Sequence, residues 1–135
     1  MFVSPSTEDQ RFLRRVLPPS NWAVFKARTC SEARDLLREA EIQVVVCERD
    51  LPDGGWKDLL EHVAAAARVP CLIVTSRLAD ELLWAEVLNL GGYDVLAKPL
   101  DAEEAARVIE LAHQHWERHQ DRRGASSYSI SNAMY

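Results

Sequence analysis

Residues 44–56 of the chain are VVVCERDLPDGGW, and this stretch decides the class of fold. Three valines and a cysteine form a continuous apolar run, which is typical of a strand buried on both faces of a parallel sheet. The run ends at Glu48, and a turn rich in proline, aspartate and glycine comes after it. The pattern therefore places an acidic side chain at the point where a buried strand reaches the surface.

Four further stretches have the length and composition of strands, and amphipathic helical patterns separate them. They are MFV at the start of the chain, WAVFKA (22–27), CLIVT (71–75) and YDVLA (93–97). Thr29 and Glu32 suit a capping box at the start of the second helix. Five alternating βα units predict an α/β fold of three layers, in which a doubly wound, five-stranded parallel sheet carries helices on both faces.

Length and composition fit one globular domain, because the 135 residues are 47% hydrophobic and 27% charged. No apolar run is long enough to span a membrane and no targeting segment is evident, so we expect a cytoplasmic protein without a membrane partner. The formal charge of −5, with basic residues scattered along the chain, argues against nucleic acid as a partner. We expect the domain to occupy residues 1–121, and residues 122–135 to form a polar, disordered tail.

The cysteines and histidines do not predict a metal centre. The three cysteines are widely spaced and form no CxxC motif, which indicates reduced thiols rather than a disulfide framework or a zinc site. Cys47 and Cys71 lie in strand-like runs, so we expect both to be buried as small apolar side chains. Late in the last expected helix stand His113, His115 and His119. Since no further ligand of fixed geometry is near them, we expect them to line a solvated helix end.

In open α/β sheets, the functional crevice lies beyond the carboxyl ends of the strands. The residues expected there are Ser4, Pro5, Glu48, Thr75 and Lys98. Over about residues 1–120 the chain resembles the CheY-like receiver domain of two-component response regulators. The resemblance rests on three motifs in chain order: the LPDG turn (51–54), Thr75 in LIVTS, and Lys98-Pro99 in VLAKPLD. It implies a flavodoxin-like sheet with strand order 2-1-3-4-5, and a bacterial phosphorelay role.

Four positions depart from the pattern of that family. Counting back from the proline of the LPDG turn places Glu48 where the family has its phospho-accepting aspartate. The acidic pair that helps to hold Mg²⁺ in the family falls on Ser4 and Pro5, which supply no carboxylate, and its aromatic switch position falls on Val95. The carboxylate of a glutamate also lies about 1.5 Å farther from the backbone than that of an aspartate. We therefore expect Mg²⁺ binding to be weak or absent, and autophosphorylation to be lost or very slow.

Glu48 extends a fixed negative charge toward the place that a phosphoryl group would occupy. Lys98 and Thr75 are its natural partners, through a charge-assisted hydrogen bond and a hydroxyl donor. We expect a permanent contact between Glu48 and Lys98 that holds the domain in one state; a plain structural ion pair is the alternative. The sequence then indicates an atypical, single-domain receiver that is not an enzyme, signals through a histidine kinase or a downstream effector, and does not depend on phosphorylation.

Two other functions stay open. A phosphorylation-competent receiver would use Asp50 or Asp53 as a substitute acceptor, although both residues suit turn chemistry. A small-molecule or nucleotide-binding α/β protein would need a glycine-rich phosphate loop after the first strand, and VSPSTEDQ (3–10) contains no glycine.

The fourth expected helix carries more apolar side chains than one core-facing stripe requires. The stripe itself consists of Leu83, Val87 and Leu90. Trp84 and Leu88 lie about 100–140° around the helix from it, and large apolar groups on such a flank often mark a contact surface. The resemblance implies a homodimer or a partner at the face formed by the fourth helix, the fifth strand and the fifth helix. The alternative is that Trp84 packs under the loop around Leu78.

Overall fold

Five parallel strands form the central sheet of the computed structural model, which describes residues 1–133 and the side chains of residues 1–119. Across the sheet the strands are β2 (Lys26–Ala27), β1 (Phe2–Val3), β3 (Val44–Glu48), β6 (Cys71–Ser76) and β7 (Asp94–Ala97). Counted along the chain, this is the predicted order 2-1-3-4-5. A small antiparallel pair, β4 (Asp50–Leu51) and β5 (Gly54–Gly55), comes after β3.

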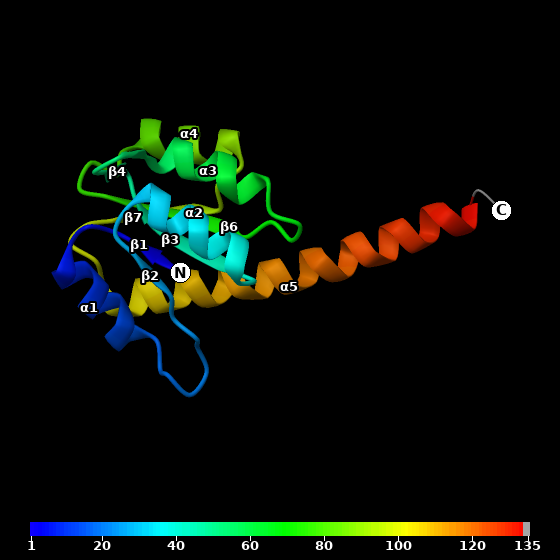
Figure 1. Cartoon of the computed structure of the whole chain (residues 1–135), viewed down its shortest axis with the longest axis horizontal. Helices are drawn as coiled ribbons and strands as arrows, with labels where there is room; N and C mark the ends of the chain where they lie inside the picture. Colours follow the sequence, from blue (N-terminus) through cyan, green and yellow to red (C-terminus); the bar gives the residue numbers. More distant parts are fainter. Residues whose placement is uncertain (134–135) are drawn as a thin grey trace.

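Five helices cover the two faces of the sheet, so the predicted three-layer α/β fold is confirmed. They are α1 (Thr7–Val16), α2 (Cys30–Glu39), α3 (Trp56–Ala64), α4 (Glu81–Leu90) and α5 (Ala102–Ala133). Figure 1 shows α1 and α5 on one face, with α2, α3 and α4 on the other. The N-cap of α2 is Thr29, whose side chain accepts a hydrogen bond from the Glu32 amide at 3.1 Å, as predicted. The reciprocal half of the predicted capping box differs, because the Glu32 carboxylate accepts its hydrogen bond from the Arg28 amide and not from Thr29.

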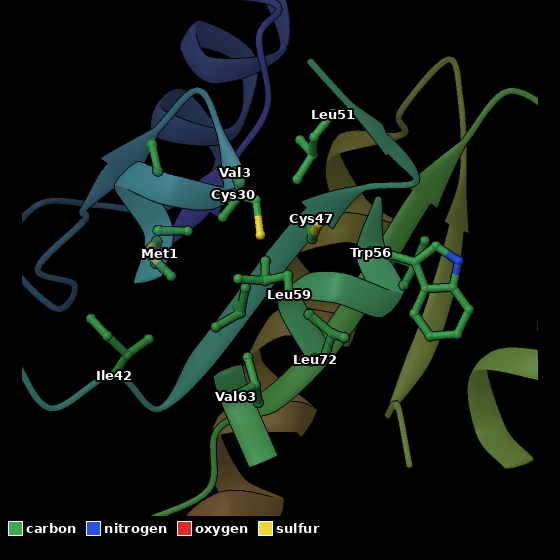
Figure 2. Close-up of a cluster of buried hydrophobic side chains, with 14 of the residues drawn as sticks. Met1, Val3, Cys30, Ile42, Cys47, Leu51, Trp56, Leu59, Val63 and Leu72 are labelled. Atoms are coloured by element: carbon green, nitrogen blue, oxygen red, sulfur yellow. The ribbon is translucent and has the colours of Figure 1, made fainter. Parts of the chain in front are cut away.

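The alternation of side chains along β3 explains why its sequence is apolar throughout. Val45 and Cys47 belong to the core under α2, α3 and α4, whereas Val44 and Val46 belong to the core under α1 and α5. Figure 2 shows the first core, in which Leu59 of α3 lies among side chains of several elements. Because each face of β3 is buried against helices, a strand with polar residues at alternate positions would not fit here.

The thiols match the expectation of small buried groups in part. Cys47 is fully buried and Cys30 is nearly so, and both lie in the core of Figure 2, whereas Cys71 is only half-buried. Burial raises the pKa of the Cys47 thiol far above its ordinary value, and it raises the pKa of Cys71 to about 11. These two thiols are therefore protonated and unreactive at neutral pH.

Two details of the fold differ from the sequence prediction. The second strand is only two residues long, because β2 is an edge strand and pairs with β1 over Lys26 and Ala27 alone. Leu90 is exposed rather than part of the core-facing stripe. It is the last residue of α4, and the chain leaves the helix at Gly91, which adopts the left-handed conformation with φ 106°.

The last helix continues through the position at which we expected the domain to end. α5 extends to Ala133 and projects beyond the sheet (Figure 1), so the backbone shows no change of structure at residue 121. The side chains beyond residue 119 and all of residues 134–135 lie outside the described part, and the tail at 122–135 stays a prediction. None of the helices within residues 1–133 is both long enough and apolar enough to cross a membrane.

Candidate functional site

Four side chains from four parts of the chain meet at the carboxyl edge of the sheet. Glu48 ends β3, and Thr75 lies directly opposite it on β6. Lys98 comes directly after β7, and its amide donates a hydrogen bond to the carbonyl of Ser76 at 3.0 Å. Asp9 reaches the same place from the first turn of α1. The parallel pairing of β3, β6 and β7 therefore fixes three of the four positions before any side chain makes a contact.

One oxygen atom of Glu48 lies at the centre of this group. Its Oε2 accepts a hydrogen bond from Lys98 Nζ at 2.9 Å and another from Thr75 Oγ1 at 3.1 Å. Lys98 Nζ also forms an ion pair with Asp9 Oδ2 at 2.5 Å. The side chains of Lys98, Glu48 and Asp9 are only 11%, 18% and 19% exposed. The contact between Glu48 and Lys98 expected from the sequence is thus present, and a second carboxylate shares the same ammonium group.

The ammonium group of Lys98 is held in its charged form by these carboxylates. Burial alone would lower the pKa of Lys98, but the hydrogen bonds with Asp9 and Glu48 outweigh this effect and raise the pKa above 10.5. At neutral pH the group is therefore a fixed cation between two acidic side chains.

The two residues after β1 do not contribute to this group. Ser4 is buried, and its hydroxyl oxygen accepts a hydrogen bond from the Ser6 amide at 3.1 Å. Pro5 is exposed, and its carbonyl accepts a hydrogen bond from the Arg28 guanidinium at 2.7 Å. As their residue types require, neither provides a carboxylate at the edge of the sheet.

Asp9 is the residue of the site that was not predicted from the sequence. Counting without gaps from β1 leads to the two residues directly after the strand, whereas Asp9 lies in the next helix. Its position depends on Ser6, the N-cap of α1, whose side chain accepts a hydrogen bond from the Asp9 amide at 3.2 Å. The available signal was the acidic first turn of α1, since a helix that comes after a parallel strand begins at the carboxyl edge of the sheet.

Asp50 and Asp53, the two alternative phospho-acceptors considered from the sequence, do not lie beside Glu48 and Lys98. Asp53 accepts hydrogen bonds from the amides of Cys30 at 2.8 Å and Ser31 at 3.0 Å, so both of its oxygens cap the start of α2. These two backbone hydrogen bonds hold the pKa of Asp53 below its ordinary value of 3.8. Asp50 is exposed and pairs with Gly55 in the small hairpin. Both residues therefore serve the turn after β3.

The donor set at the edge of the sheet is a poor fit for Mg²⁺. Octahedral Mg²⁺ requires oxygen ligands on several sides, and here an ammonium group already lies between the two carboxylates. Among residues with described side chains, no three of His, Cys, Asp and Glu are grouped so that they could hold a metal ion. The histidines of α5 contact each other and a glutamate instead. The rings of His115 and His119 stack with centroids 5.8 Å apart, and His113 Nδ1 lies 3.7 Å from Glu117 Oε1.

A second feature lies on and before α4, away from the acidic group. Leu78, Leu82 and Trp84 are 67%, 81% and 51% exposed, and we call these three residues the α4 patch. Leu88 is half-buried. Since both Leu78 and Trp84 expose more than half of their surface, the loop around Leu78 does not cover the indole. Leu82 was not predicted from the sequence, because only the flank that carries Trp84 and Leu88 was considered.

The family model of the response regulator receiver domain matches residues 6–110. The chain belongs to this family. It is 29% identical over 98 residues to the "Probable transcriptional regulatory protein y4xI" of Sinorhizobium fredii, a match that covers 73% of this chain and 43% of that protein. The chain thus spans less than half of the length of this relative.

Solved receiver domains share the fold. The signal receiver domain of an HD domain-containing protein from Pseudomonas fluorescens Pf-5 has a TM-score of 0.80 and 24% identity, over 90% of both chains. The beryllofluoride-activated NtrC4 receiver domain dimer has a TM-score of 0.78 and 20% identity, over 85% of this chain and 95% of that one. Receiver domains act in two-component signal transduction and interact with protein partners such as kinases and effectors.

Proposed function

We propose that this chain is an atypical receiver domain that signals through protein contacts without being phosphorylated. The observation that carries the proposal is the bonding of Glu48 Oε2, which accepts hydrogen bonds from both Thr75 and Lys98. These two groups line the place that a phosphoryl group would occupy. A carboxylate oxygen of the longer side chain thus takes the contacts that a phosphorylated aspartate would make, and it does so permanently.

The same geometry opposes the transfer of a phosphoryl group. Transfer to a carboxylate requires in-line attack, together with a divalent cation that neutralises charge on the moving group. Here the only cation at the carboxylates is Lys98, within the part of the chain whose side chains are described. The second carboxylate, Asp9, adds negative charge that repels a phosphodonor. Because a misplacement of about 1 Å can slow a reaction by about a hundredfold, we expect the transfer to be negligible.

Intact mass measurement tests the proposal. The chain is incubated with acetyl phosphate and Mg²⁺, beside a typical receiver domain as a positive control for the reagents. We expect the mass of this chain to stay unchanged while the control gains one phosphoryl group. A stable gain on this chain would contradict the proposal. If that gain then disappeared in Asp53→Asn or Asp50→Asn, but not in Glu48→Gln, the substitute acceptor would be identified.

A spectrum of backbone amides tests whether the domain is held in one state. Beryllofluoride with Mg²⁺ mimics a phosphoryl group on a receiver aspartate, so we expect it to leave the amide spectrum of this chain unchanged. Glu48→Gln, which removes the charge but keeps the size, should shift the amides of Thr75 and of α4. A spectrum that responds to beryllofluoride in the same way as a typical receiver would show that a phosphate-responsive switch is retained.

The α4 patch is the surface through which we propose that the domain meets a second copy of itself or a downstream effector. Leu82 and Trp84 lie on the two flanks of the buried Leu83, and large apolar side chains that a monomer exposes often mark such a surface. Sedimentation of a Leu82→Ala/Trp84→Ala variant tests self-association. Arg38→Ala is the control, since Arg38 is an exposed residue on α2, which is not part of the expected face. We expect the double variant, and not the control, to sediment as a monomer. If the double variant kept the association state of the native chain, the α4 patch would not be part of the interface.

A further inference from the structure

Basic residues that are far apart in the sequence lie together at the β2 edge of the sheet. The sequence shows them as scattered, but the fold places Arg11 and Arg14 of α1 beside Lys26 of β2 and Arg28. A cavity of about 540 Å³ opens between them, and its lining consists of Thr7, Gln10, Arg11, Arg14, Lys26, Arg28 and Glu32. Four basic side chains thus face one acidic side chain in a chain whose net charge is −5. We call this cavity the basic groove.

The positions on α1 explain how the basic groove is formed. Thr7, Arg11 and Arg14 are spaced by four and three residues, so they lie on one face of the helix. This face lies about 100–160° around the helix from Leu13, which is buried in the core with α5, so it flanks the buried side of α1. Arg28 closes the far side, because its guanidinium donates hydrogen bonds to Pro5 O at 2.7 Å and to Thr7 Oγ1 at 3.3 Å. As β2 is an edge strand, no neighbouring strand covers the groove.

The charges in the basic groove are not balanced within the domain. Among the side chains that the structure describes, none forms an ion pair or a hydrogen bond with Arg11, Arg14 or Lys26. The one acid of the lining, Glu32, is already engaged, since its Oε2 accepts a hydrogen bond from the Arg28 amide at 2.8 Å. Three cations that converge without a partner attract an anion of high charge density, and the planar fork of arginine matches phosphate oxygens.

A buried and unpartnered atom lies in the same wall. Gln10 is 6% exposed, and its Nε2 donates to the carbonyls of Phe2, Ser4 and Ala27, which fixes the side chain. Its Oε1 is buried and accepts no hydrogen bond from the described residues. A buried carbonyl oxygen without a donor is costly. Only a movement of the Gln10 side chain would bring this oxygen into contact with a ligand in the groove.

We propose that the basic groove binds a small phosphorylated molecule that carries a diphosphate or two neighbouring phosphate groups. The volume lies within the range of small-molecule sites, about 300–1,000 Å³. A single carboxylate would neutralise only one of the three free cations, whereas a diphosphate can contact all three. This site is separate from Glu48, so the proposal holds whether or not the domain is phosphorylated.

Calorimetric titration of the full chain with inorganic diphosphate and with ADP tests the proposal, in buffer without Mg²⁺. We expect saturable binding that weakens as salt is added. Arg11→Gln/Arg14→Gln should weaken it about tenfold or more, since each exposed arginine contributes a charge-assisted hydrogen bond. Arg107→Gln, which removes an exposed charge from α5 outside the groove lining, should leave it unchanged. Both arginines of the double variant are exposed, so its urea midpoint should match that of the native chain.

Four outcomes would overturn the proposal. One is the absence of saturable binding of either probe, and another is an equal loss in Arg107→Gln. The third is tighter binding of a single-stranded oligonucleotide or of poly-glutamate than of diphosphate, which would assign the groove to a macromolecule. The fourth is that the amides of Lys26 and Arg28 do not shift in an NMR titration with diphosphate, because the anion would then bind elsewhere. Any of these outcomes would overturn the basic groove as a binding site, but none would bear on the proposed function, which the mass measurement tests separately.

Discussion

The two halves of the crevice differ in how far they keep the receiver pattern. On the side of β6 and β7, Thr75 and Lys98 occupy the expected strand ends and contact the residue that ends β3. On the side of β1, Ser4 and Pro5 replace the acidic pair, and the negative charge comes instead from Asp9 in α1. The ends of β6 and β7 therefore carry the residue types that the resemblance implies, whereas on the side of β1 the carboxylate that reaches the site comes from a helix.

The difference shows how the charges of the crevice are balanced. An acceptor aspartate together with an acidic pair would place three carboxylates in one crevice, where they repel each other unless a divalent cation is bound. This chain has two carboxylates, and the ammonium group of Lys98 contacts both. The ammonium group offsets part of the negative charge of the crevice, so the lysine has a structural role here as well as its place in the receiver motif.

Removal of the lysine should have the largest effect. Lys98→Met leaves two carboxylates that are mostly buried and unpaired, so we expect the free energy of unfolding to fall by about 2 kcal/mol or more. Urea unfolding at neutral pH measures it. The matched control is Lys57→Met, which breaks the 2.7 Å ion pair with Glu86, whose side chains are 59% and 44% exposed. The control should lose about 0.5 kcal/mol. Equal losses in the two variants would show that the charge balance of the crevice is unimportant.

The same lysine predicts a pH dependence at the alkaline end. The folded-state pKa of Lys98 is raised above its ordinary value of 10.5, so the folded chain holds this proton more tightly than the unfolded chain. The stabilisation is therefore complete below 10.5 and is lost as the pH rises through the folded-state pKa. We expect the stability gap between the native chain and Lys98→Met to narrow in urea titrations above that pH. A gap that stays constant into strong alkali would contradict this assignment.

Removal of the carboxylate from the helix should have a smaller effect. Asp9→Asn leaves the contacts of Glu48 with Lys98 and Thr75 in place, so we expect a loss of about 1 kcal/mol in urea unfolding. Glu8→Gln is the matched control, because Glu8 also lies in the acidic first turn of α1 and carries the same charge near the helix N-terminus. If both variants lost the same amount, Asp9 would act on the helix dipole rather than on Lys98.

The strand pattern can be predicted from the sequence, whereas the side chains that helices and turns supply cannot. The apolar runs predict the ends of β3, β6 and β7, and the family resemblance implies the strand order, so Glu48, Thr75 and Lys98 lie at or next to the strand ends expected for them. Asp9 was missed because its position depends on where α1 begins, which Ser6 determines. The basic groove was missed for the same reason, since spacing along the chain does not show which helix face lies beside an edge strand.

Replacement of Asp53 should have the smallest effect on stability. It tests whether this aspartate acts as a helix cap or is available as a phospho-acceptor. Asp53→Asn retains one oxygen acceptor but loses the charge near the amides of Cys30 and Ser31, so we expect a lower urea midpoint at neutral pH. Because the pKa of Asp53 is depressed in the folded chain, its contribution is present above 3.8 and is lost as the pH falls through the folded-state value. The difference in urea midpoint between the native chain and Asp53→Asn should therefore disappear at strongly acidic pH.

The control for this measurement is Asp50→Asn, an exposed aspartate in the neighbouring hairpin. We expect it to change the urea midpoint less than Asp53→Asn does at neutral pH. The comparison matters for the crevice, since a carboxylate whose two oxygens each accept an amide hydrogen bond at the start of α2 is held away from Thr75 and Lys98. If Asp53→Asn changed the urea midpoint as little as Asp50→Asn, the contribution of the cap would be weak. Asp53 would then again be a candidate phospho-acceptor, in a chain whose Glu48 is already bound to Lys98.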